Sequence, residues 1–134
     1  ALGARCDAVV VAAGGADLAA ELRRGRLSAL QVKDALRQLA TALAAMHAAG
    51  LVHGDVKPHN VVAVVDGAAT RWLLCDLDAC VRVGEATPAG GALTPQYAAP
   101  ERVAARARGE VHYAAEADDV WALGVVVAQA RRDG

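Results

Sequence analysis

The chain contains no phenylalanine and no isoleucine, and aromatic residues make up only 3% of its 134 residues. Hydrophobic residues reach 55%, but about a quarter of the chain is alanine, so large side chains that can fill a core are scarce. This hydrophobic content excludes a disordered tail, and the length suits one domain rather than two. We therefore expect one folded domain of low stability.

An excess of charge of one sign is also missing. The 14 basic and 15 acidic residues leave a net charge of -1, which argues against the broad basic surface that non-specific nucleic-acid binding requires. The most apolar stretches, residues 40–49 and 120–130, are shorter than the roughly 20 residues needed to span a bilayer. We expect neither nucleic acid nor a membrane as a partner.

Cysteine is rare and irregularly spaced. Cys6, Cys75 and Cys80 are odd in number and form no C-x-x-C pair, which disfavours a disulfide framework or a zinc site. We expect a reducing, intracellular compartment, the cytoplasm. The chain begins at Ala1 without a methionine and ends just after a helical pattern, so we expect a piece of a larger protein.

Helical signals dominate the first half of the chain. The valine-rich residues 8–13 predict a short buried strand, and residues 16–24 predict a short helix. Ser28, three residues before Gln31, forms a capping box, and leucines at helical spacing follow until Gly50. The capping box and this glycine predict a long helix between them.

Strand signals follow. Residues 61–65 and 72–75 predict a β-hairpin, with residues 68–71 widening its loop. Residues 76–100 are rich in Gly, Pro, Thr and Ala, which predicts no regular structure. The arginines within residues 23–26 and 102–108 predict solvated faces.

A last helix closes the pattern. Asp118 or Asp119 is predicted to cap a helix over residues 120–131 that is almost entirely apolar and therefore buried. The expected fold is mainly α with one small β-hairpin.

Three polar groups are closely spaced in residues 51–60, LVHGDVKPHN. A carboxylate at Asp55, a cation at Lys57 and an amide oxygen at Asn60 can converge on one loop. There they can accept a hydroxyl proton, neutralise a phosphate and hold a hard cation. A polar loop that merely caps the preceding helix is the alternative.

This segment resembles the catalytic loop of protein kinases, in which His, Asp, Lys, Pro and Asn occupy the same spacings. Residues 73–80, LLCDLDAC, resemble the Asp-Phe-Gly segment, with Asp76 as the magnesium ligand and Leu77 and Asp78 in place of Phe and Gly. Aspartate adopts the backbone angles of glycine only at some cost. Alone, Asp76 is equally well explained as a solvated residue at a strand end.

Two later strings extend the resemblance. Residues 94–101, TPQYAAPE, resemble the end of the kinase activation segment, and residues 119–124, DVWALG, resemble the start of the central helix. The resemblance implies that the Thr94 hydroxyl points at the catalytic Asp and Lys and that Glu101 forms a structural ion pair. It also implies that Asp119 holds the catalytic-loop backbone, although an ordinary helix cap explains Asp119 alone.

The resemblance runs from a hinge-like strand at Val9–Val11 to the central helix. It implies nucleotide contacts from Val11 and from Asp17 at the ribose, although the preference of helix N-termini for negative charge explains Asp17 equally well. His53 is expected beneath the catalytic loop, His47 packed at the end of the long helix, and His59 and His112 exposed.

Several features of that family are missing from the chain. No glycine-rich phosphate loop and no VAIK-like lysine are present. We therefore expect residues 1–134 to be a partial C-lobe (α+β) of a kinase catalytic domain, without the N-lobe and the final helices, and inactive alone. Gly54 replaces an arginine that binds a phosphorylated activation segment in many kinases, which implies that this switch does not operate here.

The implied activity is phosphoryl transfer from ATP, with magnesium (Mg2+), to Ser or Thr hydroxyls of a protein substrate. Asp55 and Lys57 would act in catalysis with Thr94, and the nucleotide and metal would be held by Lys57, Asn60 and Asp76. Two alternatives stay open. One is a small-molecule kinase of the aminoglycoside or choline type, in which the HGD spelling is also used. The other is a pseudokinase scaffold that binds partners.

Overall fold

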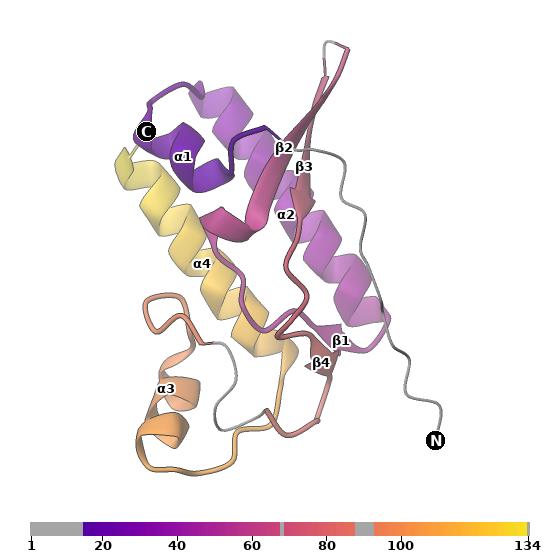
Figure 1. The fold of residues 1–134 in the computed structure, drawn as a ribbon, viewed down its shortest axis with the longest axis vertical. Helices are drawn as coiled ribbons and strands as arrows, with labels where there is room; N and C mark the ends of the chain where they lie inside the picture. The colour runs from indigo at the N-terminus through magenta and orange to yellow at the C-terminus, as the bar shows by residue number, and fades with distance from the viewer. Residues whose placement is uncertain (1–14, 68, 88–92, 134) are drawn as a thin grey trace.

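The computed structural model describes residues 15–67, 69–87 and 93–133 (Figure 1). The strand expected at Val9–Val11, and with it the Val11 contact, lies outside these residues. Helices make up about half of the described chain, and the strands form two antiparallel pairs, β1 with β4 and β2 with β3. The elements are α1 (Leu18–Arg23), α2 (Ala29–Ala48), β1 (Leu51–Val52), the 3-10 helix η1 (Pro58–Asn60), β2 (Val61–Asp66), β3 (Ala69–Leu74), β4 (Val81–Arg82), α3 (Pro100–Ala107) and α4 (Glu116–Asp133).

The first two helices begin directly after their capping residues, Asp17 and Ser28. The Asp17 carboxylate accepts a hydrogen bond of 2.7 Å from the Ala20 amide and caps α1. Ser28 and Gln31 complete the predicted capping box at the start of α2, and Gly50, just beyond its end, has a left-handed φ of +73°. Both predicted helices are confirmed.

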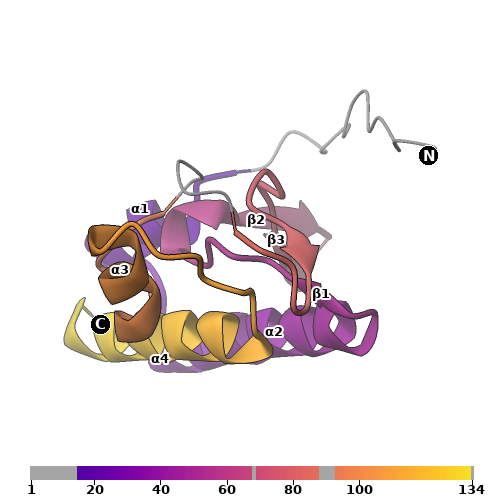
Figure 2. The same ribbon diagram turned by 90° about the horizontal axis from the view of Figure 1, so that it is seen from below.

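The core lies between the long helices and the hairpin. Figure 2 shows α2 and α4 side by side in one layer, with α1 and the β2–β3 hairpin on the same side of it. The Gln38 side chain on α2 also bonds the backbone of Thr70 and Trp72 on β3, at 3.2 and 2.9 Å. Large side chains buried in the core are Leu18, Leu22, Leu39, Leu43, Val56, Val61, Trp72, Tyr97 and Val126.

The β-structure corrects two predictions. Ala69–Arg71 belong to β3, which pairs from Asp66↔Ala69 onward, so a loop widened by residues 68–71 is wrong. Residues 76–100 contain β4, whose Val81 pairs with Val52 of β1, so the absence of regular structure there is also wrong. Two-residue strands carry no periodicity that a sequence pattern can reveal.

Helix α3 was not predicted, and α4 differs from its prediction. Helix α4 begins at Glu116, so Asp118 and Asp119 lie inside its first turn and neither is its cap. Val120 and Trp121 are 59% and 49% exposed, so the expectation of a helix buried throughout is wrong. One face of α4 packs on the core. The face that carries Val120 and Trp121 is not covered by any described residue.

Candidate active site

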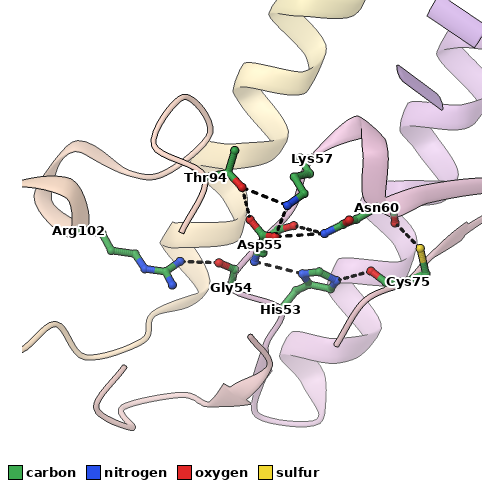
Figure 3. Close-up of polar contacts among 8 residues, drawn as sticks. All are labelled: His53, Gly54, Asp55, Lys57, Asn60, Cys75, Thr94 and Arg102. Carbon is green, nitrogen blue, oxygen red and sulfur yellow. Dashed lines mark hydrogen bonds and ion pairs between the residues drawn. The ribbon is translucent and has the colours of Figure 1, made fainter. Parts of the chain in front are cut away.

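Asp55 is the centre of a polar cluster formed by two distant segments (Figure 3). Lys57 Nζ lies 2.5 Å from Asp55 Oδ2, within the loop between β1 and η1. From the segment before α3, the Thr94 hydroxyl donates to Asp55 Oδ1 at 2.8 Å and accepts from Lys57 Nζ at 3.1 Å. The sequence-predicted carboxylate, cation and hydroxyl are therefore in mutual contact.

Asn60 closes the same loop. Its amide nitrogen donates to the Asp55 carbonyl at 2.9 Å and lies 3.3 Å from Asp55 Oδ2, and the side chain is buried. Pro58 begins the single turn of η1 that carries Asn60 back toward Asp55. Because the amide nitrogen of Asn60 points toward Asp55, the amide oxygen of the same side chain points away from Asp55.

The environment of Asp55 keeps it ionised. Burial opposes the charge, but hydrogen bonds from Lys57, Thr94 and Asn60, together with the Lys57 charge, outweigh it and lower the pKa of the carboxyl group below its ordinary 3.8. Asp55 is therefore a carboxylate at neutral pH, able to accept a hydrogen bond from an incoming hydroxyl.

Asp119 anchors the backbone of this loop to α4. Its carboxylate, 1% exposed, accepts from the amides of His53 at 2.8 Å and Gly54 at 2.9 Å, and lies 2.9 Å from His47 Nε2. The role that the resemblance implied for Asp119 is thereby confirmed. His53 is fully buried beneath the loop, where its ring accepts from the Asp55 amide and contacts the Cys75 carbonyl, as expected.

Asp76 follows β3 beside this loop. The Cys75 amide and thiol both contact the Asn60 carbonyl, at 2.9 and 3.3 Å, which brings the two segments together. Asp76 is exposed and has a left-handed φ of 66°, and no described residue forms a hydrogen bond or ion pair with its carboxylate. Within the described residues no other non-glycine has a positive φ, so Asp78 carries none of the strain expected from replacing Gly.

The donor set of Asn60 and Asp76 fits a magnesium ion. An amide oxygen and an unpaired carboxylate are hard oxygen ligands, and Mg²⁺ commonly takes one or two protein ligands plus phosphate and water. No group of three His, Cys, Asp or Glu side chains suited to a metal exists among the described residues. Two protein ligands of this kind leave room in the coordination sphere for phosphate and water oxygens.

Asp17 lies close enough to this region to act on Cys75. Burial raises the pKa of the Cys75 thiol, and the charges of Asp76 and Asp17 raise it further. One Asp17 oxygen caps α1, so the helix-terminus explanation holds, and the ribose contact stays a prediction. Cys75 and Cys80 are both free thiols.

Some residues of the site were missed by the sequence patterns. Arg102, predicted to be solvated, is half-buried and bonds the Gly54 carbonyl. His112, predicted to be exposed, lies 2.9 Å from the buried carboxylate of Asp118. Pro100 at the first position of α3 was the available signal for the helix that presents Arg102. Glu101 is exposed and makes no ion pair with any described residue.

No helix in the described part of the chain is long and apolar enough to cross a membrane.

Comparison with known proteins agrees with this geometry. Residues 9–132 match the family described as protein kinase domain. The chain is 39% identical over 105 residues to the serine/threonine-protein kinase PknA of Mycobacterium tuberculosis and of Mycobacterium bovis, covering 78% of this chain and 23% of each relative. It is 36% identical over 93 residues to the human serine/threonine-protein kinase MRCK gamma, covering 67% of this chain and 6% of that relative.

The chain thus spans about a quarter or less of the length of these relatives. The family match nevertheless extends from before α1 into the end of α4, and it includes every residue of the Asp55 cluster. On that match the chain belongs to the protein kinase domain family.

Proposed function

We propose that the protein containing this chain transfers the γ-phosphoryl group of ATP to Ser or Thr hydroxyls of proteins, and that residues 1–134 are a C-lobe part of its catalytic domain. One observation carries the proposal: the Thr94 hydroxyl joins Asp55 and Lys57 at 2.8 and 3.1 Å. A segment 39 residues away thereby completes the arrangement around the proposed catalytic carboxylate. The serine/threonine kinase names of the relatives agree with it.

Asp55 is the proposed acceptor of the substrate proton. Its lowered pKa keeps it charged, and its two oxygens are oriented by bonds to Thr94 and Lys57. An incoming hydroxyl that bonds this carboxylate is aligned for attack on a phosphoryl group, which is most of what phosphoryl-transfer catalysis requires.

Lys57 is the proposed cation beside the transferred group. Its side chain is 20% exposed and its ammonium lies between Asp55 and Thr94, so its position is held by both. A fixed positive charge there stabilises negative charge that develops on the phosphoryl oxygens.

Asn60 and Asp76 are the proposed magnesium ligands, and Lys57, Asn60, Asp76, Asp17 and Val11 are the proposed nucleotide contacts. Bound magnesium supplies neutralisation of the phosphate charge. The buried Asn60 is oriented by its bonds to Asp55, and the Asp76 carboxylate has no competing partner among the described residues. The cytoplasmic location stays a prediction.

The test compares Thr94→Val with the unchanged full-length protein that contains this chain. Valine keeps the shape of threonine but removes the hydroxyl, and a lost bond to charged groups costs about 1.5–3 kcal/mol, or about ten- to a hundredfold in rate. We expect peptide phosphorylation to fall by that factor, with ATP affinity nearly unchanged. Thr87→Val is the matched control, because among the residues that the structure describes the Thr87 hydroxyl bonds only the His112 carbonyl.

Asp55→Asn provides the inactive reference in the same assay. If Thr94→Val leaves turnover intact while an aminoglycoside or choline-like acceptor is phosphorylated faster than any peptide, the substrate is a small molecule and the proposal is wrong. Full activity of Asp55→Asn would exclude Asp55 as the catalytic carboxylate.

A further inference from the structure

The Gly54 carbonyl accepts a hydrogen bond from a residue far along the chain. Arg102 Nη1 donates to it at 2.5 Å across 48 residues, and Figure 3 shows Arg102 reaching Gly54 from the side opposite Asn60. This carbonyl belongs to the peptide bond that joins Gly54 to Asp55. Arg102 therefore contacts the peptide unit directly before the proposed catalytic carboxylate.

Each remaining polar group of this peptide region is also held. The Gly54 amide donates to Asp119 and the Asp55 amide donates to His53, at 2.9 and 3.2 Å. Gly54 itself has a left-handed φ of +80°, which glycine adopts without strain. The Arg102 bond is the contact that ties this peptide to α3.

A side chain at position 54 cannot replace that contact in this backbone. A Cβ atom at Gly54 would lie 2.6 Å from the Ala79 carbonyl oxygen, which is backbone and cannot move aside cheaply. The loop therefore has no room for a side chain at position 54. A side chain at position 54 therefore does not supply the donor in this backbone, and Arg102 supplies it from another segment.

The location of Arg102 couples two parts of the site. It stands on α3, eight residues after Thr94, whose hydroxyl bonds the Asp55 side chain. A small cavity between the segments is lined by Gly54, Asp55, Thr94, Arg102, Asp118 and Asp119. Three buried carboxylates, those of Asp55, Asp118 and Asp119, line this cavity together with Arg102.

We propose that Arg102 is a positioning residue for phosphoryl transfer: it holds the Gly54–Asp55 peptide and makes the orientation of Asp55 depend on the docking of α3. The proposal rests on the proposed function. Thr94 fixes the carboxylate of Asp55 and Arg102 fixes its backbone, so one segment aligns the residue at both ends. Displacement of that segment then removes both contacts at once.

The experiment uses the full-length protein with Arg102→Met, which keeps the apolar stem and removes the donor, and with Arg102→Lys, which keeps a charged donor. Arg108→Met is the matched control, because Arg108 is the C-cap residue of α3 and makes a surface ion pair with Glu110. Two readouts are taken: kcat and KM for ATP and peptide, and amide hydrogen exchange of residues 53–56. The rate of amide hydrogen exchange does not depend on whether the protein transfers phosphoryl groups.

We expect Arg102→Met to lower kcat about tenfold with both KM values within about twofold, because misalignment acts on the transition state. Exchange of residues 53–56 should rise by up to about tenfold while other regions stay unchanged. For Arg102→Lys, kcat and the exchange of residues 53–56 should lie between the values for Arg102→Met and for the unchanged protein. Arg108→Met should match the unchanged protein.

Three results would overturn the proposal: a raised KM with kcat unchanged, which means a substrate contact; exchange at residues 53–56 that does not change; or faster exchange throughout the chain, which means a merely structural role. If the unchanged protein phosphorylates no protein while Arg102→Met still accelerates exchange at residues 53–56, the proposed function fails and the holding of this peptide by Arg102 stands.

Discussion

At the scale of single residues, the two aspartates that follow β3, Asp76 and Asp78, differ in backbone conformation. Asp76 has a φ of 66°, a left-handed conformation that Asp and Asn adopt more readily than most residues because their short side chains bond locally. Asp78, two residues later, is exposed and has no positive φ. The chemistry proposed for this segment therefore depends on Asp76, and the backbone does not require glycine at position 78 in this conformation.

Asp76→Asn in the full-length protein should weaken magnesium-dependent ATP binding and abolish phosphoryl transfer, because an amide is a poorer ligand for a hard cation than a carboxylate. Asp78→Gly should keep activity at or above that of the unchanged protein. Both variants remove one exposed carboxylate, so each controls for the other. ATP titration at several magnesium concentrations and a peptide assay measure the effect; the reverse ranking would mean that Asp78 is the ligand.

At the scale of elements, α2 and α4 do different work. Helix α2 contributes buried leucines to the core and bonds the backbone of β3 through Gln38. Helix α4 supplies the anchor of the loop through Asp119, and Gln129 accepts a bond of 2.6 Å from the Tyr97 hydroxyl in the segment before α3. Both helices contribute to the core, and α4 in addition contacts both segments that form the site.

Leu39→Ala should lower the free energy of unfolding by about 2–5 kcal/mol, because Leu39 is 1% exposed and its removal leaves a cavity among the core side chains. Leu30 is 79% exposed on the same helix, so Leu30→Ala is the matched control and should change stability by less than about 0.5 kcal/mol. Denaturant unfolding of the full-length protein measures both. Equal effects of the two substitutions would show that α2 packs through another face.

At the scale of the whole molecule, the Asp55 cluster joins segments that are remote in sequence. The Asp55 carboxylate binds Lys57 in its own loop and Thr94 in the segment before α3. Its pKa in the folded state lies below the ordinary 3.8, so folding favours the charged form. The cluster therefore contributes stability that is fully present above the unfolded-state pKa and is lost as the pH falls through the folded-state pKa.

The unchanged protein should be more stable than Asp55→Asn near pH 6, and this advantage should shrink as the pH falls below the ordinary 3.8 and through the lowered pKa of the folded state, where the carboxyl group becomes protonated. Asparagine cannot titrate, so the variant isolates the contribution of Asp55 from that of other carboxylates. Unfolding free energies at several pH values measure the difference. An advantage that stays constant between these pH values would place the origin of the stability elsewhere.

Several parts of this molecule follow from local sequence alone. The capping box at Ser28 and Gln31 and the leucines after it predict α2 because a helix is stabilised by residues one turn apart. The spacing of Asp55, Lys57 and Asn60 predicts a shared loop because its ends are only five positions apart. The family resemblance rests on such short-range strings.

Tertiary structure alone decided the rest. Strand β4 forms because β1 lies beside it, since two residues make no pattern. Val120 on α4 is exposed although its sequence neighbourhood is apolar, because only one face of the helix meets the core. Arg102 reaches Gly54 across 48 residues, and no sequence pattern indicated this contact because it depends on the path of the chain. The contact of Thr94 with Asp55, across 39 residues, was implied by the family resemblance, but its geometry is set by the same path.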